Sequence, residues 1–327
     1  MAKIFISGAT GYIGEQLSRT LAERGHSVTA LLRNPQKSAR LEHPNIHPAA
    51  GTLDDPDRLA AALEGCTEAY HIAALAGVWH RDPNAFRNIN VTGTLNVLAA
   101  ARRAGVRRVV MTSTAGVMGP TPDGRLVDET TNPAPDLTTE YERSKLEAEL
   151  AACAFGAEHE LEVVIVNPSR VYGPGQWSES NGVTKMIKGY AAGRWRMIPG
   201  DGNSIGNYVF VDDVVQGHIL AMEKGRPGER YILGGENASF NEFFALCADL
   251  TGRRHRMIRL PLPVMMGFAR TQQFLADTIG RKPVITPPFV HKFLRNWPLS
   301  HQKAETQLGY TPLSLEEGMR RTLAWLG

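Results

Sequence analysis

The chain has 327 residues, of which 43% are hydrophobic, and its formal net charge is +3 at pH 7. This length exceeds one average domain and predicts one large unit with an appended lobe, or about two domains. The lysines and arginines are scattered and nearly balanced by acidic residues, which predicts no nucleic-acid or membrane-surface partner. The three cysteines are widely spaced, so we expect reduced thiols in a cytoplasmic protein.

The first 25 residues read as a strand, a glycine turn and a helix. Residues 4–6 form a short apolar run typical of a strand buried on both faces, and apolar residues recur at helical spacing over residues 13–21. Gly8, Gly11 and Gly14 occupy the turn between them. Glycines there allow a tight turn, a close approach of the backbone to a pyrophosphate, and packing of the helix on the strand. The pattern predicts a dinucleotide site, although glycine turns also simply reverse chains.

The next predicted strand, residues 26–32, ends where a dinucleotide fold selects its cofactor. An acidic residue at that end binds the adenosine ribose 2′-hydroxyl, whereas an arginine accommodates a 2′-phosphate. The position expected to be acidic is Leu32, Arg33 follows it, and Lys37 is a second cation. We therefore expect NADP(H) rather than NAD(H), the alternative being that Arg33 is a solvated surface residue.

Strand and helix patterns then alternate along the chain. Strands are expected at residues 45–53, 69–74, 106–114 and 161–166, with helices at residues 57–63, 90–105 and 141–155. This alternation predicts an α/β fold with a Rossmann-type, doubly wound parallel sheet. We expect residues 1–170 to form the dinucleotide-binding domain and residues 171–327 a smaller, mostly helical substrate-binding lobe, with residues 207–235 returning to the first domain.

Hydroxyl and phenol groups provide candidate chemistry. The fifth strand ends in Thr112, Ser113 and Thr114, and ligands bind beyond such strand ends. Tyr141 and Lys145 are four residues apart and share one helix face. A nearby ammonium favours the phenolate, so Lys145 is expected to lower the pKa of Tyr141, and it could also bond a nicotinamide ribose. Such a pair also occurs by chance on solvated helices.

The glycine turn, the hydroxyl cluster and the Tyr-x-x-x-Lys pair together resemble the extended short-chain dehydrogenase/reductase family, the NAD(P)-dependent epimerase/dehydratase superfamily. Residues 141–149, 163–169 and 211–221 are similar to its dihydroflavonol 4-reductase-like branch. That branch includes 3β-hydroxysteroid dehydrogenase-like and hopanoid-associated sugar epimerase-like proteins, and residues 228–237 look especially like the last of these.

The resemblance implies a Ser/Thr-Tyr-Lys active site. Matching residues 114–119 to the family's Ser-x-x-Val-Tyr-Gly motif assigns the catalytic hydroxyl to Thr114, with Ser113 as the fallback. Thr114 would hold the substrate oxygen, Tyr141 would pass a proton to it, and Lys145 would tune Tyr141.

The glycine turn, the end of the second strand and the resemblance together give an expected set of cofactor-binding residues. The set consists of Gly8, Thr10, Gly11, Tyr12, Ile13, Gly14, Arg33, Lys37, Thr52, Leu53, Ala73, Ala74, Thr112, Tyr141, Lys145 and Pro168. Thr52 departs from the family, where aspartate is frequent, and this leaves the adenine contact open.

Two features bear on the substrate. Nucleotide-sugar members usually carry an arginine after the Gly-Asp-Gly segment (residues 200–202) to hold a diphosphate, but Gly206 stands at the matching place. Six large side chains could line an apolar pocket, the alternative being ordinary packing in the lobe. They are Trp79, Tyr172, Trp177, Trp195, Met265 and Met266.

We therefore expect an NADP(H)-dependent oxidoreductase that acts on a carbonyl or hydroxyl group of a mid-sized, largely apolar substrate. The alternatives are an NAD-dependent sugar epimerase or dehydratase and a non-catalytic cofactor-sensing scaffold. The family often dimerises through two helices, here residues 88–104 and 141–155, so a homodimer is expected. His71 lies among apolar neighbours and is expected to be a core residue, and the spacing of the ten histidines predicts no metal site.

Overall fold

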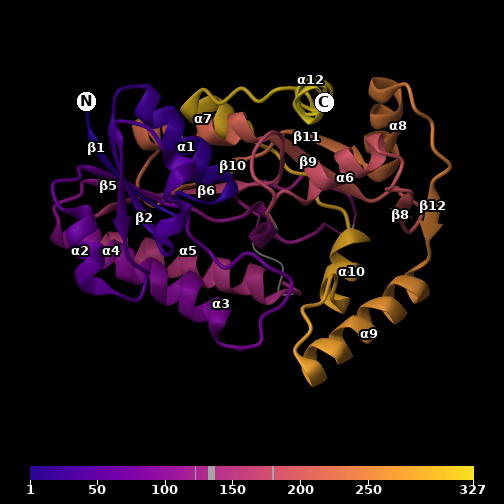
Figure 1. The fold of residues 1–327 in the computed structure, drawn as a ribbon, viewed down its shortest axis with the longest axis horizontal. Coiled ribbons are helices and arrows are strands. Elements are labelled where there is room, and N and C mark those ends of the chain that lie inside the picture. Colours follow the sequence, from indigo (N-terminus) through magenta and orange to yellow (C-terminus); the bar gives the residue numbers. More distant parts are fainter. Residues whose placement is uncertain (122, 132–136, 179) are drawn as a thin grey trace.

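A computed structural model describes residues 1–121, 123–131, 137–178 and 180–327 (Figure 1). At its centre lies a seven-stranded parallel sheet with the strand order β10-β6-β5-β4-β1-β2-β3. The strands are β1 (Lys3–Ser7), β2 (Ser27–Leu32), β3 (Ile46–Ala50), β4 (Glu68–His71), β5 (Arg108–Thr112), β6 (Glu162–Pro168) and β10 (Arg230–Leu233). The order reverses between β1 and β4, where open sheets of this kind bind ligands. The predicted Rossmann-type fold is confirmed.

Helices cover both faces of the sheet because its strands are apolar on both sides (Figure 1). One face carries α1 (Tyr12–Glu23), α7 (Val211–Lys224) and α11 (Gln302–Leu308), and the other carries α2 (Pro56–Leu63), α4 (Gly93–Arg103) and α5 (Glu140–His159). Short helical segments connect them: η1 (Pro35–Leu41), α3 (Ala85–Arg87), the π-helical turn η2 (Asn88–Thr92) and η3 (Ala115–Met118).

The C-terminal lobe contains two small sheets as well as helices. One has the order β11-β9-β7 and the other pairs β12 with β8. Their strands are β7 (Arg170–Tyr172), β8 (Met197–Pro199), β9 (Ile205–Phe210), β11 (Glu236–Ser239) and β12 (Ile258–Leu260). The helices of the lobe are α6 (Gly182–Ala191), α8 (Phe240–Thr251), α9 (Leu262–Ile279), α10 (Pro287–Phe293) and α12 (Leu315–Leu326). Most of these strands were missed in the sequence because three to six residues give too short a pattern.

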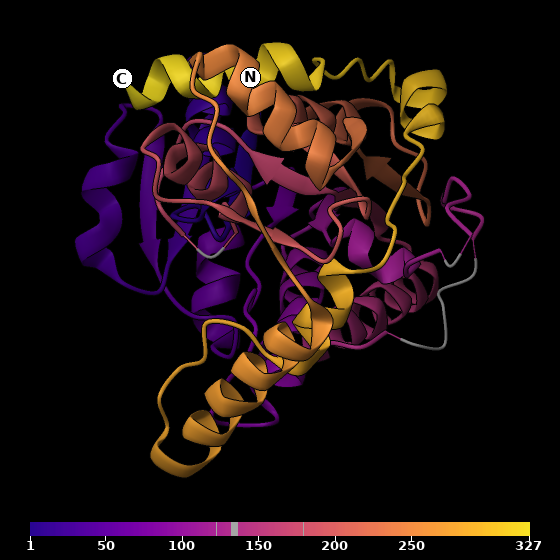
Figure 2. The same ribbon diagram turned by 90° about the vertical axis from the view of Figure 1, so that its right-hand side faces the viewer.

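The two parts of the chain are interwoven. β10 pairs with β6 in the central sheet, and α7 packs against β6, whereas β9 pairs with β7 and β11 in the lobe. In Figure 2, α9 projects away from the rest of the protein. Within the described residues, no helix has the length and apolar character needed to cross a bilayer.

His71 at the end of β4 is a satisfied core residue, as predicted. Its Nδ1 lies 2.7 Å from the Ser7 hydroxyl and its Nε2 lies 2.9 Å from the Thr94 hydroxyl. Burial, the largest cause, lowers the pKa of His71 to about 3, so the ring is neutral at physiological pH. The ring therefore joins β1, β4 and α4 through hydrogen bonds at both of its nitrogens.

Candidate active site

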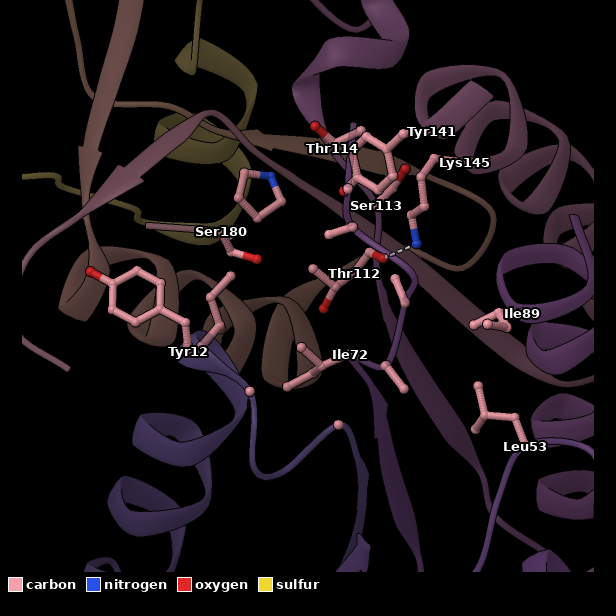
Figure 3. Close-up of a pocket in the computed structure, with 18 of the residues that line it drawn as sticks. Tyr12, Leu53, Ile72, Ile89, Thr112, Ser113, Thr114, Tyr141, Lys145 and Ser180 are labelled. Atoms are coloured by element: carbon pink, nitrogen blue, oxygen red, sulfur yellow. Dashed lines mark hydrogen bonds between the residues drawn. The ribbon is translucent and has the colours of Figure 1, made fainter. Parts of the chain in front are cut away.

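A cavity of about 1010 Å³ lies at the carboxyl ends of the central strands (Figure 3). Residues at or after the ends of β1, β2, β3, β4, β5 and β6 line it, as do the start of α1 and four residues of the lobe, Val171, Ser180, Phe289 and Lys292. Among the described side chains, the expected cofactor set lines this cavity with one exception, Gly14. The side chain of Lys37 lies outside the part of the chain that the structure describes.

The glycine turn leaves the backbone bare at one wall of the cavity. Gly8 has a φ of +76°, and a Cβ there would lie 2.6 Å from the backbone nitrogen of Ala73. A Cβ on Gly14 would lie 2.1 Å from the carbonyl oxygen of Gly8, so Gly14 acts in packing and not in lining. α1 begins at Gly11 without a side-chain cap, and Tyr12 and the residues beside it face the cavity. Bare backbone amides and the positive end of a helix fit a pyrophosphate.

A segment of the lobe covers this turn. The Tyr12 hydroxyl donates to the carbonyl oxygen of Gly173 at 2.9 Å, and the Gln16 amide donates to that of Pro174 at 2.7 Å. The Gln176 amide donates to the carbonyl oxygen of Thr10. These contacts hold the phosphate-binding turn against the segment after β7. The two glutamines carried no signal in the sequence, because their partners are more than 150 residues away.

The part of the cavity that follows β2 and β3 is suited to the adenosine half of a dinucleotide. Arg33 is exposed beside it, directly after β2. The carbonyl oxygen of Leu53 accepts a hydrogen bond of 2.9 Å from the Asn96 amide. Leu53 also packs against Gly93, where a Cβ would lie 3.0 Å from the Leu53 side chain. Thr52 and Leu53 thus form a fixed edge of the cavity.

The three residues expected to be catalytic meet in the cavity, at the end opposite the start of α1 in the view of Figure 3. Thr114 follows β5 and caps η3, where its hydroxyl accepts a 3.2 Å hydrogen bond from the Gly116 amide. Tyr141 is the second residue of α5. The Lys145 ammonium donates to the carbonyl oxygen of Thr112 at 2.7 Å. The fallback residue, Ser113, also lines the cavity.

The pKa of Tyr141 shifts in the direction opposite to the predicted one. Burial raises it to about 12, the negative charge of Glu142 adds to the rise, and a hydrogen bond with Thr114 opposes it. Lys145 was expected to lower this pKa, but its ammonium is bonded to the carbonyl oxygen of Thr112. Desolvation of the phenolate therefore outweighs the ammonium, and Tyr141 is a protonated phenol at neutral pH.

A buried polar network lies behind Lys145. Burial lowers the pKa of Lys145 to about 8, and the neighbouring carboxylate of Glu149 opposes this shift. Glu149 accepts a 2.6 Å hydrogen bond from the Asn167 amide, and that same amide donates to the carbonyl oxygen of Thr114 at 3.1 Å. Asn167 therefore ties the end of β6 to the residue that carries the expected catalytic hydroxyl. The sequence marked Asn167 only as a strand end.

An ion pair joins the lobe to the first turn of α5. The Glu142 carboxylate is fully buried and lies 2.5 Å from the Lys292 ammonium of α10. The same carboxylate accepts a 2.8 Å hydrogen bond from the Thr139 hydroxyl, which caps α5. A Cβ on Gly116 would lie 3.0 Å from Glu142 and 3.3 Å from Lys292. The ion pair thus lies against the turn after Thr114. Its carboxylate belongs to the residue that directly follows Tyr141.

Of the two interpretations of the large lobe side chains, the structure favours packing over a pocket. None of the six side chains named for it lines the cavity within the described residues. Tyr172 lies in the core of the lobe, and Trp195 packs against that core. Trp177 is 45% exposed and lies against Trp325, with 5.8 Å between the ring centroids. Ordinary packing, the alternative interpretation, accounts for these positions.

The guanidinium of Arg170 lies beside Gly206, the position at which nucleotide-sugar members of the family usually carry an arginine. A Cβ on Gly206 would lie 2.3 Å from the guanidinium of Arg170. This guanidinium lies over the Tyr208 and Phe240 rings, 5.5 and 5.6 Å from their centroids. Among the described residues, no carboxylate forms an ion pair with it. A guanidinium from β7 thus lies where β9 has only Gly206, although Arg170 is not one of the residues that line the cavity.

Comparisons with known proteins agree with this geometry. The sequence model of the NAD dependent epimerase/dehydratase family matches residues 4–234. Sterol demethylase protein B of Methylococcus capsulatus is 33% identical over 98% of this chain and 97% of its own. A 3-beta-hydroxysteroid dehydrogenase of Mycolicibacterium neoaurum is 28% identical over 99% and 91%. The structure of UDP-glucose 4-epimerase from Thermotoga maritima with UDP-glucose is similar at a TM-score of 0.82, with 26% identity over 99% and 98%.

Proposed function

Because the chain belongs to the NAD dependent epimerase/dehydratase family, we propose that it is an NADP(H)-dependent oxidoreductase that interconverts a carbonyl and a hydroxyl group on a mid-sized, largely apolar substrate. One observation carries this proposal: Thr114, Tyr141 and Lys145 share a cavity with an uncapped, glycine-lined helix start. Beyond the expected cofactor set, the cavity lining is mostly small or apolar, with Ala76, Val78 and Phe289 among its residues. The sterol demethylase protein and the hydroxysteroid dehydrogenase among the relatives support an apolar substrate.

The protein's own groups have distinct roles in this reaction. A nicotinamide bound in the cavity would supply or accept the hydride. The Thr114 hydroxyl orients the substrate oxygen, and the Tyr141 phenol transfers a proton to or from it. Because burial holds the pKa of Tyr141 at about 12, the phenol keeps its proton at neutral pH and is ready to act as an acid.

The preference for NADP(H) rests on Arg33. It directly follows β2, is exposed and borders the cavity, where a guanidinium can accept a 2′-phosphate. The position before it, Leu32, has no carboxylate that would repel that phosphate.

Replacing Tyr141 with phenylalanine tests the proposal. Loss of the phenol should lower kcat roughly 10²- to 10⁴-fold because the proton transfer loses its donor. The dissociation constant for NADPH should hardly change. Tyr190→Phe is the matched control, because this tyrosine lies in the core of the lobe, outside the cavity lining. A panel of apolar ketones with NADPH supplies the assay, and substantial turnover by the Tyr141 variant contradicts the assignment.

A nucleotide-sugar epimerase or dehydratase is the second candidate, and Arg170 favours it. Its guanidinium, which is without a carboxylate partner among the described residues, could hold a diphosphate at the place where Gly206 lacks a side chain. Net consumption of NADPH separates the two candidates, since an epimerase returns the hydride and consumes none overall. Stoichiometric oxidation of NADPH with a ketone supports the reductase.

We also propose a homodimer formed through α4 and α5. The two helices pack side by side on one face of the sheet, and Leu150 of α5 is 66% exposed there. Covering such side chains favours association. Sedimentation at micromolar concentration should give the mass of two chains, and a monomer contradicts this proposal.

A further inference from the structure

The projecting part of the lobe exposes an unusual amount of apolar surface. We call residues 258–284 the α9 arm; it comprises β12, α9 and the segment after it. Large hydrophobic side chains of the arm are between 42% and 78% exposed. They are Ile258, Leu262, Val264, Phe268, Phe274, Ile279 and Val284. Scattered exposed apolar residues need no explanation, but a run of this kind on one projecting element marks an interaction surface.

α9 is apolar on two sides, and only one of them is covered. Met265, Ala269 and Ala276 are buried, and the first two pack against Val290 of α10. Val264 and Phe268 are four residues apart and lie on a different side, which is exposed. The inner side thus builds the contact between α9 and α10, while the outer side has no covering within the described residues.

The charge around the arm is strongly positive although the whole chain is nearly balanced. Between Arg253 and Arg295 there are nine lysines and arginines and one acidic residue, Asp277. With a formal charge of +3 for the whole chain, the remaining residues are net negative. Arg259, Arg270 and Arg281 of the arm are exposed. A second copy of the chain would bring an equally cationic surface against this one, so self-association through the arm is electrostatically unfavourable.

We propose that the α9 arm docks on the surface of a bilayer that contains anionic lipids. Large apolar side chains flanked by arginines are what an interfacial helix needs: the apolar groups enter the headgroup boundary, and the cations meet the lipid phosphates. The arm is connected to the cavity through its covered side, because α10 packs on α9 and contributes Phe289 to the cavity lining. Docking of the arm would therefore bring the cavity near the phase in which an apolar substrate is dissolved.

This proposal revises the expectation, drawn from the whole-chain charge, of no membrane-surface partner. That expectation used the net charge of the whole chain, in which the positive charge around the arm is largely cancelled by the net negative charge of the other residues. The proposal stands on the arm itself and does not require the reductase activity proposed above.

Vesicle flotation of the full chain tests whether the α9 arm binds anionic bilayers. The protein should float with vesicles that contain phosphatidylglycerol and stay behind with pure phosphatidylcholine vesicles, and salt should weaken the binding. A Phe268→Ser/Phe274→Ser/Ile279→Ser variant should bind roughly a thousandfold more weakly, because each of the three apolar side chains that enter the bilayer contributes about a tenfold factor. Leu126→Ser is the matched control, since Leu126 is 60% exposed but lies outside the arm.

A variant that removes two positive charges separates the electrostatic contribution to membrane binding from the contribution of the apolar side chains. Arg270→Gln/Arg281→Gln should bind anionic vesicles more weakly and with a shallower dependence on salt. Circular dichroism establishes that the variants remain folded, which is expected because the changed side chains are exposed. The proposal is overturned if the wild type does not float, if the serine variant floats like the wild type, or if that variant instead changes a dimer into a monomer in sedimentation.

Discussion

The two ends of the cavity are built in different ways. At the cofactor end, the backbone itself approaches the ligand site, and glycines leave no room for added atoms: a Cβ on Gly8 would meet Ala73, and a Cβ on Gly14 would meet Gly8. At the substrate end, long side chains from distant parts of the chain meet, as Glu142 and Lys292 do across 150 residues. The first kind of site depends on local sequence spacing, whereas the second depends on how the lobe packs.

This difference explains why the same family can keep one cofactor chemistry while its substrates vary. A glycine cradle tolerates almost no added atom, because backbone faces backbone. A wall made from flexible side chains of the lobe can be rebuilt without disturbing the sheet. Four substitutions, each with a comparison variant, sharpen this contrast. From the largest expected effect to the smallest, they change Gly14, Lys292, Lys145 and Arg33.

Gly14→Ala is compared with a glycine substitution at an open position outside the cavity. Gly14→Ala should lower the free energy of unfolding by more than about 3 kcal/mol and abolish NADPH binding, because the new Cβ would lie 2.1 Å from the carbonyl oxygen of Gly8. Gly267→Ala in α9 meets nothing within 4 Å and should stabilise the protein by up to about 1 kcal/mol through helix propensity. Urea unfolding and NADPH titration measure both. Equal stabilities for the two variants contradict the distinction.

The cofactor end was predictable from sequence for the same reason. The apolar strand, the three glycines and the helix lie within 25 consecutive residues, so their spacing alone specifies the turn. The boundaries of the central strands fell close to the predicted ones where apolar runs were long. Lys292 could not be found in this way, because an isolated lysine in a proline-rich segment has no local pattern. The rise in the pKa of Tyr141 could not be predicted from the sequence either, since it is caused by burial, which depends on the folded structure.

Breaking the ion pair that joins the lobe to α5 should have the next largest effect. Lys292→Met leaves the fully buried carboxylate of Glu142 without its cation, which should cost about 2 to 4 kcal/mol of unfolding free energy. The uncompensated charge should also raise the pKa of Tyr141 further. The double variant Glu142→Gln/Lys292→Met should recover much of the stability. Chemical denaturation measures it, with Arg295→Met as control, and an unchanged Lys292 variant contradicts the role of the pair.

Lys145→Met should raise the free energy of unfolding, whereas Lys292→Met should lower it. Burial lowers the pKa of Lys145 from 10.5 to about 8, so the folded state holds its proton less tightly than the unfolded state. Below pH 8 the buried charge therefore destabilises the native protein, and this penalty disappears as the pH rises from 8 to 10.5. The variant should be inactive yet more stable by about 2 kcal/mol at pH 7, after allowance for the lost hydrogen bond to Thr112.

The pH dependence identifies the cause of that gain. If the buried charge is responsible, the advantage of Lys145→Met in urea unfolding should shrink between pH 8 and pH 10.5. Lys185→Met, on the exposed side of α6, controls for the loss of a lysine as such and should show no such trend. An advantage that is constant over this range, or a less stable variant, contradicts the linkage.

The smallest effect is expected for Arg33→Ala. An exposed guanidinium that meets a 2′-phosphate contributes about 1 to 2 kcal/mol, so kcat/KM with NADPH should fall roughly tenfold. The kcat/KM with NADH should stay the same, because the 2′-hydroxyl of NADH carries no charge with which the arginine could pair. Raising the salt concentration should reduce the NADPH preference of the wild type but not of the variant. Arg40→Ala in η1 is a control on the same side of the protein. An unchanged cofactor preference in Arg33→Ala removes this residue from the site and leaves the choice of cofactor to the backbone and small side chains around it.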